Sequence, residues 1–421
     1  MFSDIVRVYQ KDSKYLVLNP TVPSWIVTNI NGVLVLKCYR NDLSFEEIAK
    51  EFLNHCPSFS KYKLIDFLKK VESQGFFAEN QQYCYVASTL QSVYLNMTDK
   101  CNLNCSYCFA SSREEKTSQY LDTDNYFDLL AQMYQINKNI KVTFTGGEPL
   151  LSVNTLPVAK KALEMGFETF LLSNGTLIDK NNVDNLVSLF KHIRISMDGS
   201  TKEIYGKYRG EENFEKVKSA IELLIERGAD VTVAVVVTRE NKNDIKNMVD
   251  LWGKRLRFMP LFPMGGAVLN KRDNALTGKQ YYDVLSEDGR IEPFSDIVNI
   301  IQNAGKPHLK CALGDSELSI SATGDVYPCQ LLHNKDCYLG NVHECTLEQI
   351  LKSEKTKKFG QHSIYEIEEC RDCDVRLICG GACQARHYCE SGTIDRAGKF
   401  CDYEKTGIIN GIFSRTKLVC L

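Results

Sequence analysis

The chain has 421 residues, and its 51 Lys and Arg residues nearly balance its 53 Asp and Glu residues. This length predicts two or three domains, and the charge balance excludes a strongly basic nucleic-acid-binding protein. No apolar run approaches the ~18 residues of a membrane span, and the first residues show no export signal, so we expect a cytoplasmic protein. Because the cytosol keeps thiols reduced, the 17 cysteines indicate bound metal and not disulfide bonds.

The first 82 residues predict a small sheet followed by three helices. The strands, rich in Val, Ile and aromatic residues, are expected at residues 5–10, 15–19 and 25–29. The helices are expected over residues 32–39, from the capping-box pattern that opens at Ser44, and over a last segment that stops near Gly75. This plan is winged-helix-like, and its ordinary function is DNA binding. Ten Lys and Arg against nine Asp and Glu in residues 1–82 argue against a surface that follows phosphates.

From residue 92 onward, predicted strands alternate with amphipathic helical patterns such as residues 123–135 and 214–227. The strands are expected at residues 92–98, 141–146, 168–173, 192–197, 230–238 and 255–262. Such alternation predicts an α/β fold with a parallel sheet and right-handed crossovers. Ligands of such folds gather at the carboxyl ends of the strands.

A loop after the first of these strands carries Cys101, Cys105 and Cys108 in the spacing C-x3-C-x2-C. Three thiolates can hold three corners of a [4Fe–4S] cube and leave the fourth iron open to a small molecule. The alternative is a structural zinc site, which needs a fourth ligand nearby. None of the seven histidines lies within thirty residues of the loop, so the zinc alternative is the weaker one.

The loop, with Tyr107 just before its last cysteine, resembles the signature of radical S-adenosylmethionine (SAM) enzymes. The resemblance implies a partial (β/α)6 TIM barrel, SAM bound through the open iron, and cleavage of SAM to methionine and a 5′-deoxyadenosyl radical. It also implies a SAM pocket at the strand ends, where a Gly-Gly-Glu-Pro segment would bind the amino group and an arginine the carboxylate. Asn241 is a further candidate for this pocket. The implied cofactor-binding residues are Gly146, Gly147, Glu148, Ser173, Asn174, Ser196, Asp198 and Arg209.

The last hundred residues contain a second concentration of cysteines, whose spacing resembles the SPASM pattern of radical SAM enzymes that modify peptides. The resemblance implies two auxiliary [4Fe–4S] clusters and therefore three clusters in all. One would be bound by Cys370, Cys373, Cys379 and Cys401, and the other by Cys311, Cys329 and Cys383. A zinc ribbon is the alternative for the CxxC pair, but seven interleaved cysteines exceed one zinc site.

Some SPASM enzymes supply a fourth cysteine to the second of these clusters a few residues before the position of Cys311, but here no cysteine lies between Cys108 and Cys311. Its fourth iron is expected to be open to a substrate thiolate, or else to take Cys337, Cys345 or Cys389. The remaining cysteines are expected to be structural: Cys38, Cys56, Cys84 and Cys420.

The layout of the first 82 residues resembles the PqqD-like element that binds leader peptides in peptide-modifying enzymes. The resemblance implies three domains: residues 1–82 for leader recognition, residues 83–300 for the barrel and residues 301–421 for the SPASM domain. It implies a maturase of a ribosomally made precursor peptide, with a reductant such as flavodoxin or ferredoxin and with neither a nucleic-acid nor a membrane partner. The expected product is an intrapeptide thioether. The alternatives are a carbon–carbon cross-link, epimerisation, sulfatase maturation, an iron–sulfur electron carrier, or a peptide-binding chaperone. The residue that performs the catalysis is not assigned.

Overall fold

The computed structural model describes residues 6–78, 83, 88–112, 119–269, 274–291 and 305–421. The expected domain boundary after residue 82 adjoins a segment outside this described part of the chain, and the boundary after residue 300 falls within another. Cys84 also lies outside it. No helix among the described residues is long and apolar enough to cross a bilayer.

In the described residues, nine strands form the central sheet in the order β12-β11-β10-β4-β5-β6-β7-β8-β9. Strands β4 to β9 run parallel to one another, which confirms the predicted parallel α/β fold. Their bounds are β4 Ser92–Asn96, β5 Lys141–Thr145, β6 Glu168–Ser173, β7 His192–Ser196, β8 Val231–Val237 and β9 Leu256–Pro260. Each begins and ends within two residues of the segment predicted from the sequence.

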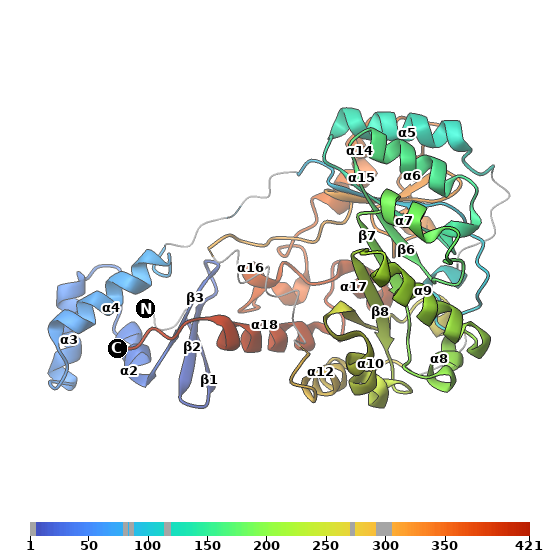
Figure 1. Ribbon diagram of the computed structural model, residues 1–421. Coiled ribbons are helices and arrows are strands. Elements are labelled where there is room, and N and C mark those ends of the chain that lie inside the picture. The colour runs from blue at the N-terminus through green and yellow to red at the C-terminus, as the bar shows by residue number, and fades with distance from the viewer. Residues whose placement is uncertain (1–5, 79–82, 84–87, 113–118, 270–273, 292–304) are drawn as a thin grey trace.

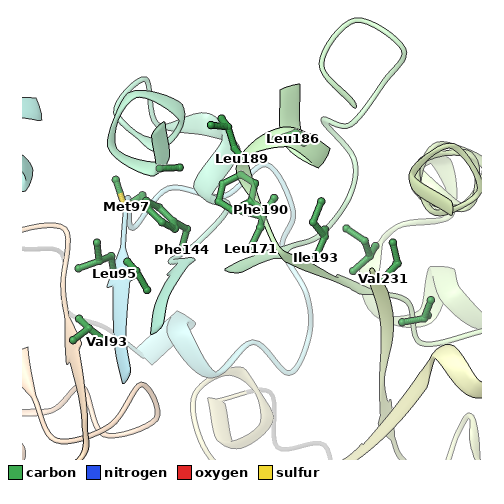
Figure 2. Packing of buried hydrophobic residues seen from close by; sticks show 14 of the residues in the cluster. Val93, Leu95, Met97, Phe144, Leu171, Leu186, Leu189, Phe190, Ile193 and Val231 are labelled. Carbon is green, nitrogen blue, oxygen red and sulfur yellow. The ribbon is translucent and has the colours of Figure 1, made fainter. Parts of the chain in front are cut away.

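Helices between these strands cover one face of the sheet (Figure 1). Along β6 and β7 fully buried side chains alternate with half-exposed ones, because successive strand residues point to opposite faces. Figure 2 shows the buried set, with Leu95 and Phe144 of the strands near Leu189 and Phe190. The other face lines the inside of the barrel. The helices are α5 Thr123–Ile136, α6 Thr155–Glu164, α7 Val183–Leu189, α8 Lys202–Arg209, α9 Phe214–Glu226 and α10 Ile245–Trp252.

The cysteine-rich region, residues 311–401, continues the same sheet. β10 pairs with β4 in parallel, with Glu317 opposite Ser92, and a hairpin then adds two antiparallel strands. The hairpin strands are β10 Glu317–Ile320, β11 Asp325–Tyr327 and β12 Gly340–Asn341. Two helices precede β10, namely α11 Gly266–Leu269 and α12 Gly278–Ser286. The helices that follow β12 are α14 Leu347–Lys352, α15 Glu354–Gly360, α16 Arg376–Cys379, α17 Gln384–Ser391 and α18 Cys401–Arg415.

The N-terminal unit, residues 6–78, has the predicted three strands followed by three helices. The strands are β1 Arg7–Lys11, β2 Lys14–Asn19 and β3 Ser24–Thr28, and the helices are α2 Ile30–Lys37, α3 Phe45–His55 and α4 Lys61–Ser73. The capping box at Ser44 and Glu47 is confirmed. α2 begins two residues earlier than predicted, because the Asn29 side chain accepts a hydrogen bond from the Gly32 amide and caps the helix there.

In the small sheet of the N-terminal unit, β3 and the second half of β2 are buried on both faces, whereas β1 is largely exposed. Val17 and Ile26 pack against the three helices. Leu18 and its neighbours on the opposite face pack against α16 and α18, including Ile412. Figure 1 shows α18 reaching from the rest of the molecule to this sheet. The N-terminal unit is therefore joined to the cysteine-rich region through an apolar contact.

Candidate functional site

The cysteine loop, residues 98–109, follows β4 and brings the first three candidate metal ligands together. Burial raises the pKa of Cys101 and Cys105, and Cys108 adds a nearby charge that raises both further. The Leu103 amide donates a hydrogen bond to Cys101 Sγ at 3.4 Å. Among the described residues no His, Cys, Asp and Glu side chains converge in the geometry of a single-ion site. A donor set of three neighbouring thiols fits a cluster, in which each sulfur binds its own iron.

The Gly-Gly pair after β5 packs directly against the start of the cysteine loop. The Gly147 amide donates to Thr98 O at 2.8 Å, and the Glu148 amide donates to Lys100 O at 2.9 Å. A Cβ atom would lie 2.4 Å from Thr98 O at Gly146 and 2.2 Å from Lys100 O at Gly147. Only glycines permit this contact, because real Cβ atoms do not approach backbone so closely. The glycines therefore position the loop that carries Cys101, a role that the sequence did not reveal.

Glu148 is fully buried and its carboxylate is used inside the protein. It accepts hydrogen bonds from Ser173 Oγ at 2.9 Å and from the Asn174 amide at 2.8 Å. Burial raises the pKa of Glu148, and these hydrogen bonds oppose the rise. Asn174 Nδ2 in turn lies 3.8 Å from Cys101 Sγ. Glu148 thus links the ends of β5 and β6 and orients Asn174 toward the cysteine loop.

Asp198 and Arg209 form a buried ion pair beside the second cysteine. The Asp198 carboxylate accepts hydrogen bonds from Arg209 Nε, from the Tyr107 hydroxyl and, at 2.8 Å, from the Val236 amide. Arg209 Nη1 points at Cys105 Sγ, 3.7 Å away. Burial lowers the pKa of Arg209, but the charge of Asp198 raises it, and the pKa of Arg209 stays well above its ordinary value. The contact from Tyr107 to Asp198 was missed from the sequence, which marked this residue only as an aromatic in the motif.

Two further predicted residues lie near this ion pair. Asn241 is buried, and its Nδ2 donates to the main-chain oxygens of Asp198 and Val236, both at 2.9 Å. It therefore supports the Asp198 loop from β8. Ser196 ends β7 and is half-buried. Seven of the eight predicted cofactor-binding residues thus lie at or just after the ends of β5, β6 and β7, and the eighth, Arg209, ends α8 and reaches Asp198.

Cys311, Cys329 and Cys383 form a second group, here called the trio. Cys311 precedes β10, Cys329 follows β11 and Cys383 occupies the N-cap position of α17. Their half-buried side chains pack against one buried apolar cluster. Burial raises the pKa of Cys311 to about 11, and the charge of Cys383 raises it further. Glu317 is hydrogen-bonded to Cys329, and burial raises the pKa of this carboxyl. Three thiols that pack against one apolar cluster again fit an iron–sulfur cluster better than they fit isolated structural cysteines.

The remaining candidate ligands, here called the four-cysteine group, come from α16, α18 and the turn before α16. They are Cys370, Cys373, Cys379 and Cys401. Burial, and then the charges of Cys401 and Cys373, raise the pKa of Cys370 to about 12. The pKa of Cys379 is raised by burial and by Glu404, Cys401, Cys370 and Cys373. Cys373 and Cys379 pack against a different apolar cluster from the one that Cys311, Cys329 and Cys383 contact.

The three spare cysteines have different surroundings. Cys345 is exposed. Cys337 is fully buried in the cluster against which the trio packs, and Cys389 is close enough to raise its pKa further. Burial, and then the charge of Cys383, raise the pKa of Cys389 to about 11, and its Sγ lies 3.7 Å from Met264 Sδ.

A cavity of about 170 Å³ is lined by residues that adjoin the cysteine loop and the trio in the sequence. Phe109, which follows Cys108, lines one side, and Gln330, which follows Cys329, lines another. Tyr388 and Cys389 of α17 complete its wall. A side chain that entered this cavity would contact residues next to both groups of cysteines.

The family models match the two regions just described. Residues 95–251 match the radical SAM superfamily, and residues 311–374 match SPASM, an iron–sulfur cluster-binding domain. Both domains imply [4Fe–4S] clusters, and the first implies SAM.

Relatives with several activities are similar to the chain. The subtilosin biosynthesis protein AlbA of Bacillus subtilis is 27% identical, over 68% of this chain and 65% of AlbA. A cysteine-type anaerobic sulfatase-maturating enzyme of Clostridium novyi is 26% identical, over 68% of this chain and 86% of that enzyme. An AdoMet-dependent heme synthase of Oleidesulfovibrio alaskensis is 27% identical, over 73% of this chain and 86% of the synthase.

Two solved structures share the fold. AnSMEcpe with bound AdoMet has a TM-score of 0.61 at 22% identity, over 77% of this chain and 98% of its own. Streptococcus suis SuiB bound to its precursor peptide SuiA has a TM-score of 0.58 at 14% identity, over 94% of this chain and 98% of its own. The cysteine loop and its barrel are thus part of a radical SAM domain, and the cysteine-rich region contains a SPASM iron–sulfur cluster-binding domain.

Proposed function

We propose that the protein is a radical SAM maturase that modifies a ribosomally made precursor peptide, and that it forms a thioether between a cysteine sulfur and a carbon of the same peptide. The observation that carries this proposal is the cavity lined by residues that adjoin the cysteine loop and the trio. A peptide side chain in it would contact residues next to the site of radical formation and next to a group of thiols that can hold an auxiliary cluster. In support, AlbA is a bacteriocin biosynthesis protein, and SuiB binds the precursor peptide SuiA.

In this proposal the cysteine loop holds the first cluster, and the trio and the four-cysteine group hold one auxiliary cluster each. When bound, these clusters would supply the electron that splits SAM into methionine and a 5′-deoxyadenosyl radical, and an acceptor for the electron released on bond formation. Overall, a C–S bond replaces a C–H and an S–H bond of the peptide. The hydrogen atom of the C–H bond goes to the 5′-deoxyadenosyl group, and the S–H bond gives up one proton and one electron. A flavodoxin or ferredoxin would be the reductant.

The chain's own residues would bind and orient the reactants. Glu148 holds Asn174 beside Cys101, and Asp198 holds Arg209 beside Cys105. Because the inward edge of the Arg209 guanidinium is already paired, only its remaining N–H groups are left for the SAM carboxylate. Cys389 lies on the cavity wall near Cys383, where it or an incoming substrate thiolate could complete the trio.

Residues 1–82 would recognise the leader of the precursor, the barrel of residues 83–300 would generate the radical, and residues 301–421 would hold the auxiliary clusters. The small three-stranded sheet supports the first assignment, because extended peptides bind proteins by adding a strand to a sheet edge.

The test uses the reconstituted protein, SAM, dithionite and the short peptide encoded beside the gene. Mass spectrometry should show that the peptide loses two hydrogens and that one cysteine becomes resistant to alkylation. Loss of two hydrogens with every cysteine still alkylated would instead indicate a carbon–carbon cross-link. An unchanged mass with solvent deuterium incorporated would indicate epimerisation, and a cysteine converted to formylglycine would indicate sulfatase-type maturation. SAM that stays intact under all conditions would contradict the radical mechanism.

A further inference from the structure

Residues 416–421, which follow α18, lie along the outer edge of β3 in the N-terminal unit. The Val419 amide donates a hydrogen bond to Val27 O at 2.8 Å, and Thr28 Oγ1 donates to Val419 O at 2.7 Å. Figure 1 shows this segment running from α18 to the vicinity of α2. Thr28 and Val419 are 391 positions apart in the sequence, so the segment beside β3 comes from the opposite end of the chain.

The segment runs alongside β3 in the same direction, although it is not a regular strand. Near its start, Trp25 Nε1 donates to Thr416 Oγ1 at 3.1 Å, and at its other end Asn29 Nδ2 donates to Leu421 O at 3.3 Å. Val419 and Leu421 are half-buried against the core of the N-terminal unit, whereas Leu418 between α18 and Val419 is 42% exposed. This alternation is the period of a β-strand, and it presents two apolar side chains, spaced two residues apart, to the core.

The contact is weak for a strand pairing. Within the described residues, one main-chain hydrogen bond joins the segment to β3, whereas a full ladder would supply several. The inward side chains of the segment stay partly exposed. The other edge strand, β1, lies against the cysteine-rich region, where Arg7 and Tyr9 both bind Asp374.

We propose that residues 416–421 are an internal occupant of the β3 edge, and that an extended peptide with apolar side chains two residues apart binds the N-terminal unit by displacing them. That this peptide is the leader of a precursor rests on the function proposed above. Because the segment is tethered to α18, its high effective concentration at β3 weakens every competing peptide. The β3 edge is then available only to a partner that pairs better than residues 416–421.

The experiment uses the segment itself as the probe. A fluorescein-labelled synthetic peptide carries the sequence of residues 415–421 with Cys420 replaced by Ser, and its binding is measured by fluorescence anisotropy. The proteins are the reconstituted full chain, the chain ended after Arg415, and a full-length double variant, Val419→Asp with Leu421→Asp. The matched control is Leu418→Asp with Cys420→Asp, since these two side chains are exposed.

The probe should bind the shortened chain and the Val419→Asp/Leu421→Asp variant, and should bind the full chain and the control about tenfold more weakly or worse. In the unaltered chain, excess probe should speed hydrogen exchange at the Val419 amide. Equal binding to the full and shortened chains would overturn the proposal, as would absence of binding to both opened variants while β3 keeps its exchange protection.

The short peptide encoded beside the gene is then added as an unlabelled competitor. Its failure to displace the probe would contradict the leader-recognition role and leave the occupancy of β3 standing.

Discussion

Arg209 Nη1 lies 3.7 Å from Cys105 Sγ, while the same guanidinium pairs with the fully buried carboxylate of Asp198. The arginine therefore carries a fixed positive charge next to a sulfur that is proposed to bind iron. Hydrogen bonds and charges around cluster sulfurs are among the factors that set reduction potential. The Asp198 pair keeps that charge in place whether or not SAM is bound.

Replacing Arg209 with Gln should destabilise the protein, because it leaves Asp198 buried without its counter-charge. Breaking a buried ion pair in this way costs about 3–5 kcal/mol. Arg209→Lys keeps the charge but not the forked geometry, and should recover part of the loss. Urea unfolding of the cluster-free protein measures the effect. The control is Arg227→Gln, whose partner Asp184 is exposed. A similar unfolding midpoint for Arg209→Gln and the control would refute the structural role.

Gly147→Ala should lose the first cluster selectively. The added Cβ would lie 2.2 Å from Lys100 O and must push the cysteine loop away from β5. Iron analysis after reconstitution should show about four fewer irons per chain, with the auxiliary clusters retained. Gly289→Ala is the control, because a Cβ there meets no atom within 4 Å. Full iron content and normal SAM cleavage in Gly147→Ala would show that the loop accommodates the methyl group.

The ligand sets can be separated by cysteine substitution. Changing Cys101, Cys105 and Cys108 together to Ala should remove about four irons and abolish SAM cleavage. Cys311→Ala should also lower the iron content but leave SAM cleavage measurable. Retained cleavage in the triple variant would contradict the assignment of the cysteine loop.

The fourth position at the trio is tested with Cys337→Ala, Cys389→Ala and the exposed control Cys345→Ala. If the iron is open to substrate, all three variants should keep a full iron content. A cysteine-containing core peptide should then change the cluster's paramagnetic spectrum, and the same peptide with Ser should not. Loss of iron in Cys389→Ala alone would show that Cys389 is the fourth ligand, so that no iron is open to substrate. That result would favour carbon–carbon coupling over thioether formation.

Leu18→Ala should weaken iron binding by the four-cysteine group, although Leu18 is not one of its ligands. Leu18 is fully buried against α18, and Cys373 and Cys379 pack against the same apolar cluster. A buried Leu→Ala change costs about 2–5 kcal/mol. Iron should therefore be lost faster during gel filtration, whereas Val8→Ala on the exposed side of β1 should behave like the unaltered protein. Equal iron retention in both variants would show that the two units are energetically independent.

Local patterns in the sequence predicted the helices and strands well. The strands follow runs of Val and Ile, and the helix after Ser44 follows its capping box, because neighbouring residues determine both. The division of the seven later cysteines into the trio and the four-cysteine group, which follows from the resemblance to the SPASM pattern, stays a prediction. These features depend on residues that are close in sequence or on a repeated motif.

The sequence could not reveal contacts between distant segments. It did not reveal that Gly147 packs on Lys100, or that the Glu148 carboxylate accepts hydrogen bonds from Ser173 and Asn174. Nothing in the residues near β3 indicates that Val419 lies beside Val27. Such pairings are set by the packing of whole elements, and single-sequence patterns do not encode them.

The parallel pairing of β10 with β4 has a consequence for attempts to divide the protein. β4 carries the cysteine loop, and β10 lies between Cys311 and Cys329, so one hydrogen-bonded ladder runs through both metal-binding regions. A barrel expressed without residues 305–421 would expose the bare edge of β4, and unprotected edges promote aggregation. The same ladder leaves no hinge between these two regions. The separation between the first and second sites is thus a fixed dimension of the sheet, to which the substrate's reacting groups must conform.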